Sequence, residues 1–318
     1  MFRTSELQNF RTSEHLNLRT SNLRTSNLRT FQPQEFMITR CYLEITNRCN
    51  LNCVFCPKTT RKGHQLTIQE FETLTDKLVG HIKFLYFHLM GEPLLHPHLP
   101  QFITTAKAKG FIPILTTNGT LLKDTDALLQ AKPHKVQISL QAHEGNTLSS
   151  AEAYITQVME FSTKAAAAGI IIVLRLWNEG GAHNTLNEHI INLLSTQSAT
   201  PWTERPDGWK IAERIYLETD TTFEWPDCER APYAESEAFC HALRNQIGVL
   251  VDGTVVPCCL DSQGAINLGN LHQQTLEEIL SSPRARRLYE GFTHHTTCEP
   301  LCKTCGYALI TKKFRKER

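Results

Sequence analysis

The sequence predicts an α/β fold: an open (βα)6 partial TIM-type barrel followed by a small cysteine-rich C-terminal extension. From residue 40 onward, short apolar segments rich in β-branched and aromatic residues alternate with amphipathic segments. Six such units are found, which are too few for a closed eight-stranded barrel. Most of the eleven cysteines fall in two groups, one within residues 49–56 and one from residue 240 onward. These three observations set the expected architecture.

The expected strands are short and apolar, as buried parallel strands are. Repeated βα units with right-handed crossovers give a parallel sheet, and its chemistry should lie at the carboxyl ends of the strands. The six segments are Tyr42–Ile45, Ile82–Leu89, Phe111–Leu115, Val136–Leu140, Ile170–Trp177 and a sixth around Arg214–Glu218.

Three expected helices carry recognisable end signals. Thr67 and Glu70 form a capping box, and that helix should end at Gly80. A second helix should run from Pro100 to Gly110. A third helix should begin with Ser149 and Glu152 and run through the alanines to Gly169.

Residues 178–236 interrupt the alternation. They read as long loops rich in Trp and Pro around one helix, from Asn184 to about Leu194. Loops of this length are typical of lids or docking surfaces, and a packed linker between modules is the alternative. We expect the barrel to occupy residues 37–220 and a linker to occupy residues 221–239.

The C-terminal segment, residues 240–318, begins with a hairpin signal. Ile247–Val251 and Thr254–Val256 flank an Asp-Gly turn, which would bring Cys240 and Cys258 together near the open end of the hairpin. A helix from about Leu276 to Leu288 would then return the chain, so that it delivers the last cysteines of the set, Cys302 and Cys305.

The amino-acid composition limits which kinds of binding partner the protein is expected to have. The chain has 318 residues and a formal net charge of +1, so composition implies neither a nucleic-acid nor a membrane partner. No apolar run approaches the roughly 20 residues of a membrane span, and there is no secretory h-region. Eleven cysteines in such a chain indicate metal or redox chemistry in a reducing, cytoplasmic setting.

Residues 1–36 are an unusual polar segment without helical or strand periodicity, which we expect to be disordered. We interpret it as a repeat upstream of a native start at Met37; a basic arm for nucleic acid is the weaker alternative. Arg-Thr recurs there at Arg3, Arg11, Arg19, Arg24 and Arg29.

The first cysteine group is Cys49, Cys53 and Cys56, spaced C-x3-C-x2-C directly after the first strand. Three thiolates on one short loop can hold three irons of a [4Fe–4S] cluster, so that the fourth iron stays open to a small molecule. A structural zinc site would require a fourth ligand close by. His64, eight residues after the last cysteine, is a poor match.

This loop, with Phe55 before its third cysteine, resembles the cluster loop of the radical S-adenosylmethionine (radical SAM) superfamily. The second set resembles the SPASM/twitch extension of those enzymes, which carries auxiliary [4Fe–4S] clusters; Gly269-Asn270-Leu271 adds to the likeness. Four cysteines instead of the full seven imply one auxiliary cluster. Cys259 could replace Cys258 as a ligand, and a zinc ribbon-like site is the alternative. The four expected ligands are Cys240, Cys258, Cys302 and Cys305.

The resemblance also implies cofactor contacts. Met90-Gly91-Glu92-Pro93 looks like the family's Gly-Gly-Glu motif, in which Glu92 would receive the methionine amino group, although a strand-ending turn explains it too. Ser139 would contact the ribose, and Arg175 the methionine carboxylate unless it forms a structural ion pair. Phe55 would pack on the adenine or on the core. The catalytic residue is not identified, and Cys298 is a weak candidate as hydrogen-atom donor or spare ligand.

The resemblance therefore implies reductive cleavage of S-adenosylmethionine to a 5′-deoxyadenosyl radical, with flavodoxin or ferredoxin as the electron donor. We expect hydrogen abstraction from a peptide or protein during maturation, a preference that comes from the frequency of such substrates in the family. A small-molecule dehydrogenase is the alternative. A non-catalytic metal-binding protein is the alternative from another class.

Overall fold

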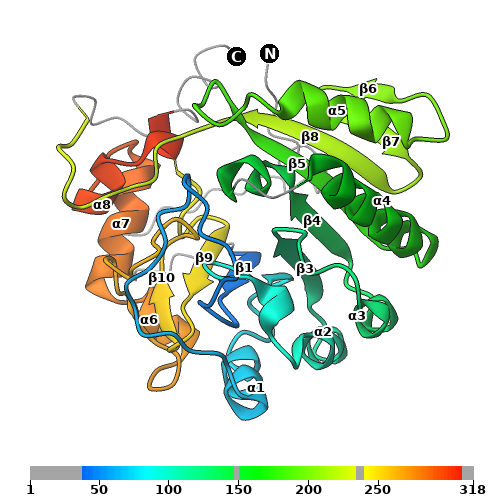
Figure 1. Ribbon diagram of the computed structural model, residues 1–318. Coiled ribbons are helices and arrows are strands. Elements are labelled where there is room, and N and C mark those ends of the chain that lie inside the picture. The colour runs from blue at the N-terminus through cyan, green and yellow to red at the C-terminus, as the bar shows by residue number, and fades with distance from the viewer. Residues whose placement is uncertain (1–37, 147–149, 234–239, 310–318) are drawn as a thin grey trace, which may run out of the picture.

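The computed structural model describes residues 38–146, 150–233 and 240–309. The expectations for residues 1–36, for Met37 and for Ser149 lie outside the described residues. Eleven strands form one sheet in the order β11-β10-β9-β1-β2-β3-β4-β5-β8-β7-β6 (Figure 1). The six predicted strands are β1 (Arg40–Leu43), β2 (Phe84–Tyr86), β3 (Ile112–Thr117), β4 (Lys135–Ser139), β5 (Ile171–Glu179) and β8 (Ile215–Thr221).

The six predicted strands are neighbours and run parallel, and the described sheet does not close on itself, so the open partial barrel is confirmed. Because side chains alternate along a strand, each strand presents one apolar face to the helices. On β5, Ile172 and Leu174 are fully buried in the main core. Arg175 and Trp177 have the opposite parity, and Trp177 lines a cavity on that side of the sheet.

Helices α1 (Ile68–Asp76), α2 (Leu99–Ala108), α3 (Asp126–Ala131) and α4 (Ala151–Ala167) cover the outer face of the sheet (Figure 1). The predicted capping box at the start of α1 is present. Phe71 of α1 stacks on Phe102 of α2 with ring centroids 4.1 Å apart. Helix α4 is capped by Ser150, whose hydroxyl accepts from the Ala153 N–H, one residue after the predicted start. Helix α3 was not predicted, because six residues give no clear periodicity.

The prediction of long loops in residues 178–236 was partly wrong. Helix α5 (Asn187–Thr196) is close to its expected place, but β6 (Thr203–Arg205) and β7 (Gly208–Ala212) form a hairpin antiparallel to β8. All three residues of β6 are exposed, so the apolar alternation that identifies a strand is missing there. The rings of Trp202 and Trp209 lie 6.1 Å apart beside this hairpin.

The predicted C-terminal hairpin is confirmed as β9 (Gln246–Val249) and β10 (Thr254–Val256). Its Asp-Gly turn places Gly253 at φ +83°, a left-handed conformation that favours glycine. Strand β9 pairs in parallel with β1, so the hairpin continues the barrel sheet, and β11 (Gly269–Asn270) follows at the edge. The domain boundaries stay predictions.

The single helix expected from Leu276 to Leu288 was wrong: the chain forms α6 (Leu276–Leu280) and α7 (Pro283–Thr293). Pro283 lacks the N–H that would continue α6. Ser282 caps the new helix by accepting from the Ala285 N–H. Helix α8 (Pro300–Lys303) follows.

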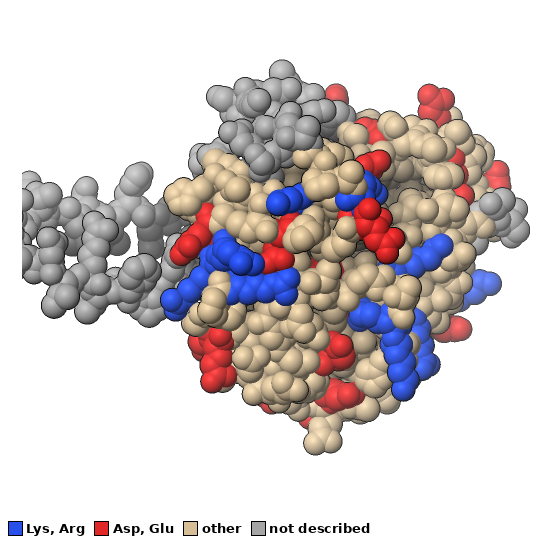
Figure 2. All heavy atoms as spheres, turned by 90° about the vertical axis from the view of Figure 1, so that its left-hand side faces the viewer, with Lys and Arg blue, Asp and Glu red and all other residues tan. Residues whose placement is uncertain are grey.

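The view from the side of α6 to α8 shows small groups of Lys and Arg with Asp and Glu between them (Figure 2). A face that binds the nucleic-acid backbone usually carries a clustered basic patch. The described residues of this face show mixed charge instead. Among the helices of the described ranges, none combines the length and apolarity that a bilayer span requires.

Candidate functional site

The loop that follows β1 carries the first cysteine group, and each of its sulfur atoms lies next to an N–H donor. Hydrogen bonds of this kind stabilise thiolates and tune iron–sulfur clusters. The donors are the Leu51 N–H to Cys49 Sγ at 3.4 Å, the Lys58 N–H to Cys56 Sγ at 3.4 Å and the Asn146 side-chain amide to Cys53 Sγ at 3.0 Å. The sulfur environment therefore fits cluster ligands.

Asn146, the last residue of the short 3-10 helix η3 (Glu144–Asn146), fixes the loop from the end of β4. Its Oδ1 accepts from the Asn52 N–H at 2.8 Å, and its Nδ2 also donates to the Ala142 carbonyl at 2.7 Å. Phe55 packs on the neighbouring Gly145, where a Cβ would lie 2.5 Å from the ring. Sequence reasoning missed Asn146, because nothing near it in the sequence marks the contact.

The end of β3 fixes the same loop from the other side. Asn118 donates from Nδ2 to Asn50 Oδ1 at 3.0 Å, and the same nitrogen lies 4.0 Å from Cys49 Sγ. Asn50 donates in turn to Thr120 Oγ1 at 2.8 Å. The Thr117-Asn118-Gly119 turn, which by sequence is a common strand end, therefore contacts the cysteine loop directly.

Glu92 is 1% exposed and connects the ends of β2 and β3. Its carboxylate accepts from the Thr117 hydroxyl at 2.8 Å, the Asn118 N–H at 2.7 Å and the Leu94 N–H at 3.0 Å. Burial raises the pKa of the Glu92 carboxyl, and these hydrogen bonds oppose the rise. Both oxygens are engaged by the chain itself, so the role of Glu92 toward an amino group stays a prediction.

Gly91 adopts φ +80° where two loops approach closely. A Cβ there would lie 2.4 Å from the Thr46 carbonyl oxygen and 2.9 Å from that of Arg48. The Arg48 carbonyl also accepts from the Glu92 N–H at 2.8 Å. A glycine is therefore required at this position by both conformation and space.

Ser139, the last residue of β4, is the register partner of Arg175 in the middle of β5, so the structure brings these two predicted contacts together. Ser139 is half-buried and Arg175 is 7% exposed. The guanidinium of Arg175 lies 3.9 Å from the centroid of the Trp177 ring, a cation–π contact that fixes its orientation. Their roles toward a cofactor stay predictions.

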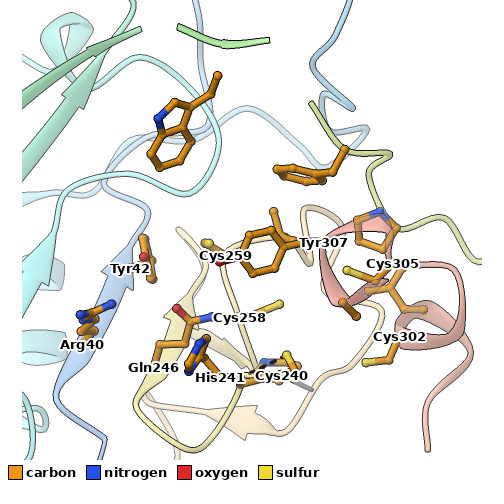
Figure 3. A pocket seen from close by; sticks show the side chains of 18 of the residues that line it. Arg40, Tyr42, Cys240, His241, Gln246, Cys258, Cys259, Cys302, Cys305 and Tyr307 are labelled. Atoms are coloured by element: carbon orange, nitrogen blue, oxygen red, sulfur yellow. Dashed lines mark hydrogen bonds between the residues drawn. The ribbon is translucent and has the colours of Figure 1, made fainter. Parts of the chain in front are cut away.

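The second cysteine set lines a cavity of about 200 Å³ between the barrel interior and the C-terminal segment (Figure 3). Burial raises the pKa of the Cys240 thiol to about 12, and it raises the pKa of Cys258 and Cys302 as well. Neighbouring cysteines raise these pKa values further, because like charges would lie close together. The cysteines on this cavity are Cys240, Cys258, Cys259, Cys302 and Cys305, all free thiols.

The side chains of Cys258 and Cys259 point in different directions (Figure 3). Cys258 points toward Cys240 and the α8 side of the cavity, whereas Cys259 points toward Tyr42 (Figure 3). Cys259 packs against the aromatic cluster of Tyr42 and Tyr86. This arrangement favours Cys258 as the ligand, as predicted, and the assignment stays a prediction.

The structure does not bring Cys298 to this cavity. Its thiol donates to the Arg287 carbonyl at 3.6 Å and packs on Gly291 of α7. His64, the alternative fourth ligand of the first loop, places its ring 3.3 Å from the Glu70 carboxylate. Within the described ranges no group of three or more His, Cys, Asp or Glu is placed to hold a single metal ion.

Two family models match the chain. The radical SAM superfamily model matches residues 43–178, and the model of the SPASM iron–sulfur cluster-binding domain matches residues 240–306. The chain carries a radical SAM domain followed by a C-terminal SPASM domain. These domains imply iron–sulfur clusters and S-adenosylmethionine, so the predicted kinds of cofactor are confirmed, and the donor sets described above fit them.

Curated relatives match this radical SAM protein over short stretches. It is 37% identical over 87 residues to the tungsten-containing aldehyde ferredoxin oxidoreductase cofactor-modifying protein of Pyrococcus furiosus, covering 26% of this chain and 24% of the relative. It is 35% identical over 114 residues to the GTP 3′,8-cyclase of Chlorobaculum tepidum, covering 34% of each. The chain thus spans about a third of these relatives or less.

Solved structures of the superfamily share the fold. BtrN in complex with AdoMet and 2-DOIA superposes with a TM-score of 0.52 at 17% identity, covering 84% of this chain and 92% of BtrN. The enzyme anSMEcpe with AdoMet and the Cp18Cys peptide gives a TM-score of 0.56 at 14% identity, covering 84% and 88%. At these identities the likeness shows the fold alone.

Proposed function

We propose that this chain cleaves S-adenosylmethionine reductively and abstracts a hydrogen atom from a peptide or protein substrate during maturation. The observation that carries the proposal is that one cysteine from each cysteine-rich region packs against the same small apolar cluster. Leu89, Met90, Leu250 and Val256 form this cluster, and Cys56 of the first set and Cys259 beside the second both pack against it. A substrate in the barrel interior would therefore have both regions as neighbours.

The first cluster would be held by Cys49, Cys53 and Cys56, whose sulfurs already receive N–H donors. When bound, the cluster and S-adenosylmethionine supply a 5′-deoxyadenosyl radical. Glu92, next to Gly91, would receive the methionine amino group, because the three donors that its carboxylate binds leave acceptor capacity for an ammonium.

The other cofactor contacts follow from the strand ends. Arg175, oriented by Trp177, would bind the methionine carboxylate, and Ser139 beside it would bind the ribose. The auxiliary cluster would be held by Cys240, Cys258, Cys302 and Cys305, which line one cavity. We keep the proposed domain division: barrel in residues 37–220, linker in 221–239 and auxiliary domain from 240 onward.

A peptide substrate is supported by two relatives. The PqqA peptide cyclase of Granulibacter bethesdensis is 29% identical over 104 residues, and the fold of anSMEcpe was determined with a peptide bound. The cavity is bordered by the aromatic side chains of Tyr42, Trp177 and Phe223, which can hold a side chain by stacking. We further propose a flavodoxin or ferredoxin donor and a cytoplasmic setting.

A small-molecule dehydrogenase is the second candidate, because the match to BtrN covers 92% of that chain and BtrN was determined with 2-DOIA. The two candidates share the cofactor chemistry and differ only in the substrate, which is a peptide in one case and a small molecule in the other.

Anaerobic purification followed by iron, sulfide and zinc analysis tests the cofactor assignment. About eight irons per chain support two clusters, whereas zinc without sulfide supports a non-catalytic metal-binding protein. A dithionite-driven assay should release 5′-deoxyadenosine, and Cys53→Ala should abolish the release while Cys298→Ala leaves it intact. Release by Cys53→Ala at the wild-type rate would refute the proposal.

Incubation with peptides encoded beside the gene, followed by mass spectrometry, separates the two substrate classes. A peptide whose mass changes only when S-adenosylmethionine is present supports maturation. An unchanged peptide together with oxidation of a small alcohol or amine supports the dehydrogenase.

A further inference from the structure

A buried ion pair lies between the first cysteine loop and the sheet. Glu44 lies one residue beyond β1 and is fully buried. Arg61, five residues after the last loop cysteine, binds its carboxylate through both terminal guanidinium nitrogens. The distances are 2.8 Å for Nη1 to Oε2 and 2.6 Å for Nη2 to Oε1. A two-point contact of this kind fixes the direction of the arginine as well as its position.

The same carboxylate connects two further strand ends. Glu44 Oε1 accepts from the Met90 N–H at 3.2 Å, and Oε2 accepts from the Val251 N–H at 3.0 Å. Met90 follows β2, and Val251 lies in the turn of the β9–β10 hairpin. The Glu44 carboxylate thus bonds to three segments at once: the end of β2, the turn of the hairpin and the segment that follows the cysteine loop.

A second contact joins the cysteine loop to the segment after Cys258. Arg61 donates from Nε to the Ser262 carbonyl at 3.0 Å. The neighbouring Gln263 accepts at Oε1 from the Thr59 hydroxyl at 3.1 Å and from the Thr60 N–H at 3.2 Å. Hydrogen bonds therefore join residues 58–61 to residues 262–263, although about 200 residues separate the two segments in the sequence.

The segment that supplies Ser262 and Gln263 is itself rigidly folded. Asp261, 1% exposed, accepts from the Ala265 and Ile266 N–H groups at 2.8 Å each, and its own N–H donates to the Cys258 carbonyl at 3.4 Å. A change at Cys258 therefore reaches Ser262 through a short, hydrogen-bonded turn. The path from one cysteine set to the other is continuous.

We propose that Arg61 is a positioning residue that couples the two cysteine sets: the turn after Cys258 holds Arg61, and Arg61 holds the loop of Cys49, Cys53 and Cys56. The order of the first loop then depends on the auxiliary site. This inference goes beyond the proposed function, because it concerns the two loops whatever the substrate is.

Amide hydrogen exchange on the anaerobically purified full chain tests the coupling without turnover. Arg61→Lys keeps the charge but loses the two-point contact. It should speed exchange about tenfold in peptides covering both 49–62 and 258–266. The control is Arg205→Lys, because Arg205 pairs with Asp207 at 3.6 Å on the β6–β7 hairpin, at the opposite edge of the sheet from the C-terminal hairpin. This control should leave residues 49–62 as in the wild type.

A second variant covers the case in which Arg61→Lys does not fold. Gln263→Ala removes only the contacts to residues 58–60 and should speed exchange there about threefold. Conversely, Cys258→Ser should speed exchange in residues 57–62. If Gln263→Ala leaves residues 57–62 at the wild-type rate, or Cys258→Ser does so, the coupling is refuted.

A spectroscopic readout separates positioning from a general loss of stability. The electron paramagnetic resonance spectrum of the reduced loop cluster, recorded in the Cys258→Ser background, should change in Arg61→Lys and remain unchanged in Arg205→Lys. Equal spectra for all three proteins would overturn the proposal. A chain that shows the exchange coupling but releases no 5′-deoxyadenosine would contradict the proposed function alone.

Discussion

Replacing Gly91 by alanine tests whether the close approach of two loops shapes the first cysteine site. Gly91 has φ +80°, and Gly80 has a nearly equal φ of +83°. An alanine in this left-handed conformation costs about 1–2 kcal/mol at either position. The surroundings differ, because a Cβ at Gly80 meets nothing within 4 Å whereas one at Gly91 lies 2.4 Å from the Thr46 carbonyl oxygen.

The difference between the two variants isolates the steric contact. An ordinary contact between carbon and a carbonyl oxygen is at least about 3.3 Å, so the Thr46 carbonyl would have to retreat by about 0.9 Å. Overpacking of this kind costs about 1–3 kcal/mol. We therefore expect Gly80→Ala to lower the free energy of unfolding by about 1–2 kcal/mol and Gly91→Ala by about 2–5 kcal/mol.

Urea denaturation under anaerobic conditions, followed by circular dichroism, measures both losses. Gly91→Ala should also bind less iron, since the displaced backbone belongs to the segment that leads into Cys49. Gly80→Ala should keep the wild-type iron content. Equal destabilisation of the two variants, within about 0.5 kcal/mol, would show that the backbone conformation alone matters and would refute the steric argument.

Four further substitutions have defined outcomes. Asn146→Leu removes the hydrogen bonds that hold the first loop, and the iron content should fall from about eight to about four per chain. Cys258→Ala should lose about four irons and Cys259→Ala none, by the same analysis; the reverse result would exchange their roles. The Arg284 guanidinium holds the pKa of the Glu299 carboxyl below its usual value. The ion pair therefore stabilises the fold fully above the pKa of the unfolded chain, which is about 4.3. This contribution disappears as the pH falls through the lower pKa of the folded protein. Arg284→Met should therefore cost about 1 kcal/mol at pH 7 and less at pH 4 in urea denaturation; a loss that does not change with pH would contradict the ion pair.

The features that the sequence predicts well depend on residues close together in the chain. The capping box of Thr67 and Glu70, the Asp-Gly hairpin turn and the six parallel strands all arise from local periodicity and turn chemistry. Where the local signal is weak, prediction fails. The β6–β7 hairpin has exposed residues in place of an apolar alternation, and a single Ser282-Pro283 step divides what reads as one amphipathic helix.

The site is predicted only in part, because its support is long-range. The cysteines can be recognised from their spacing in the sequence. Their supporting contacts cannot, because Asn146 bonds Cys53 at a separation of 93 residues and Glu44 accepts from the Val251 N–H at a separation of 207 residues. No spacing rule connects such pairs. Glu92 shows the same limit, since its motif points to the cofactor while the three donors that its carboxylate binds in the fold are not evident from the motif.

The pairing of β9 with β1 explains how two cysteine sets so far apart in sequence come to share one apolar cluster. The first loop leaves the end of β1, and Cys258 follows β10, which is hydrogen-bonded to β9. Gly248 of β9 allows this approach, because a Cβ there would lie 2.8 Å from Leu89 and 2.7 Å from Val256, both in that cluster. The C-terminal hairpin thus extends the barrel sheet beside β1, and this places the segment after Cys258 within hydrogen-bonding distance of Arg61 behind the first cysteine loop.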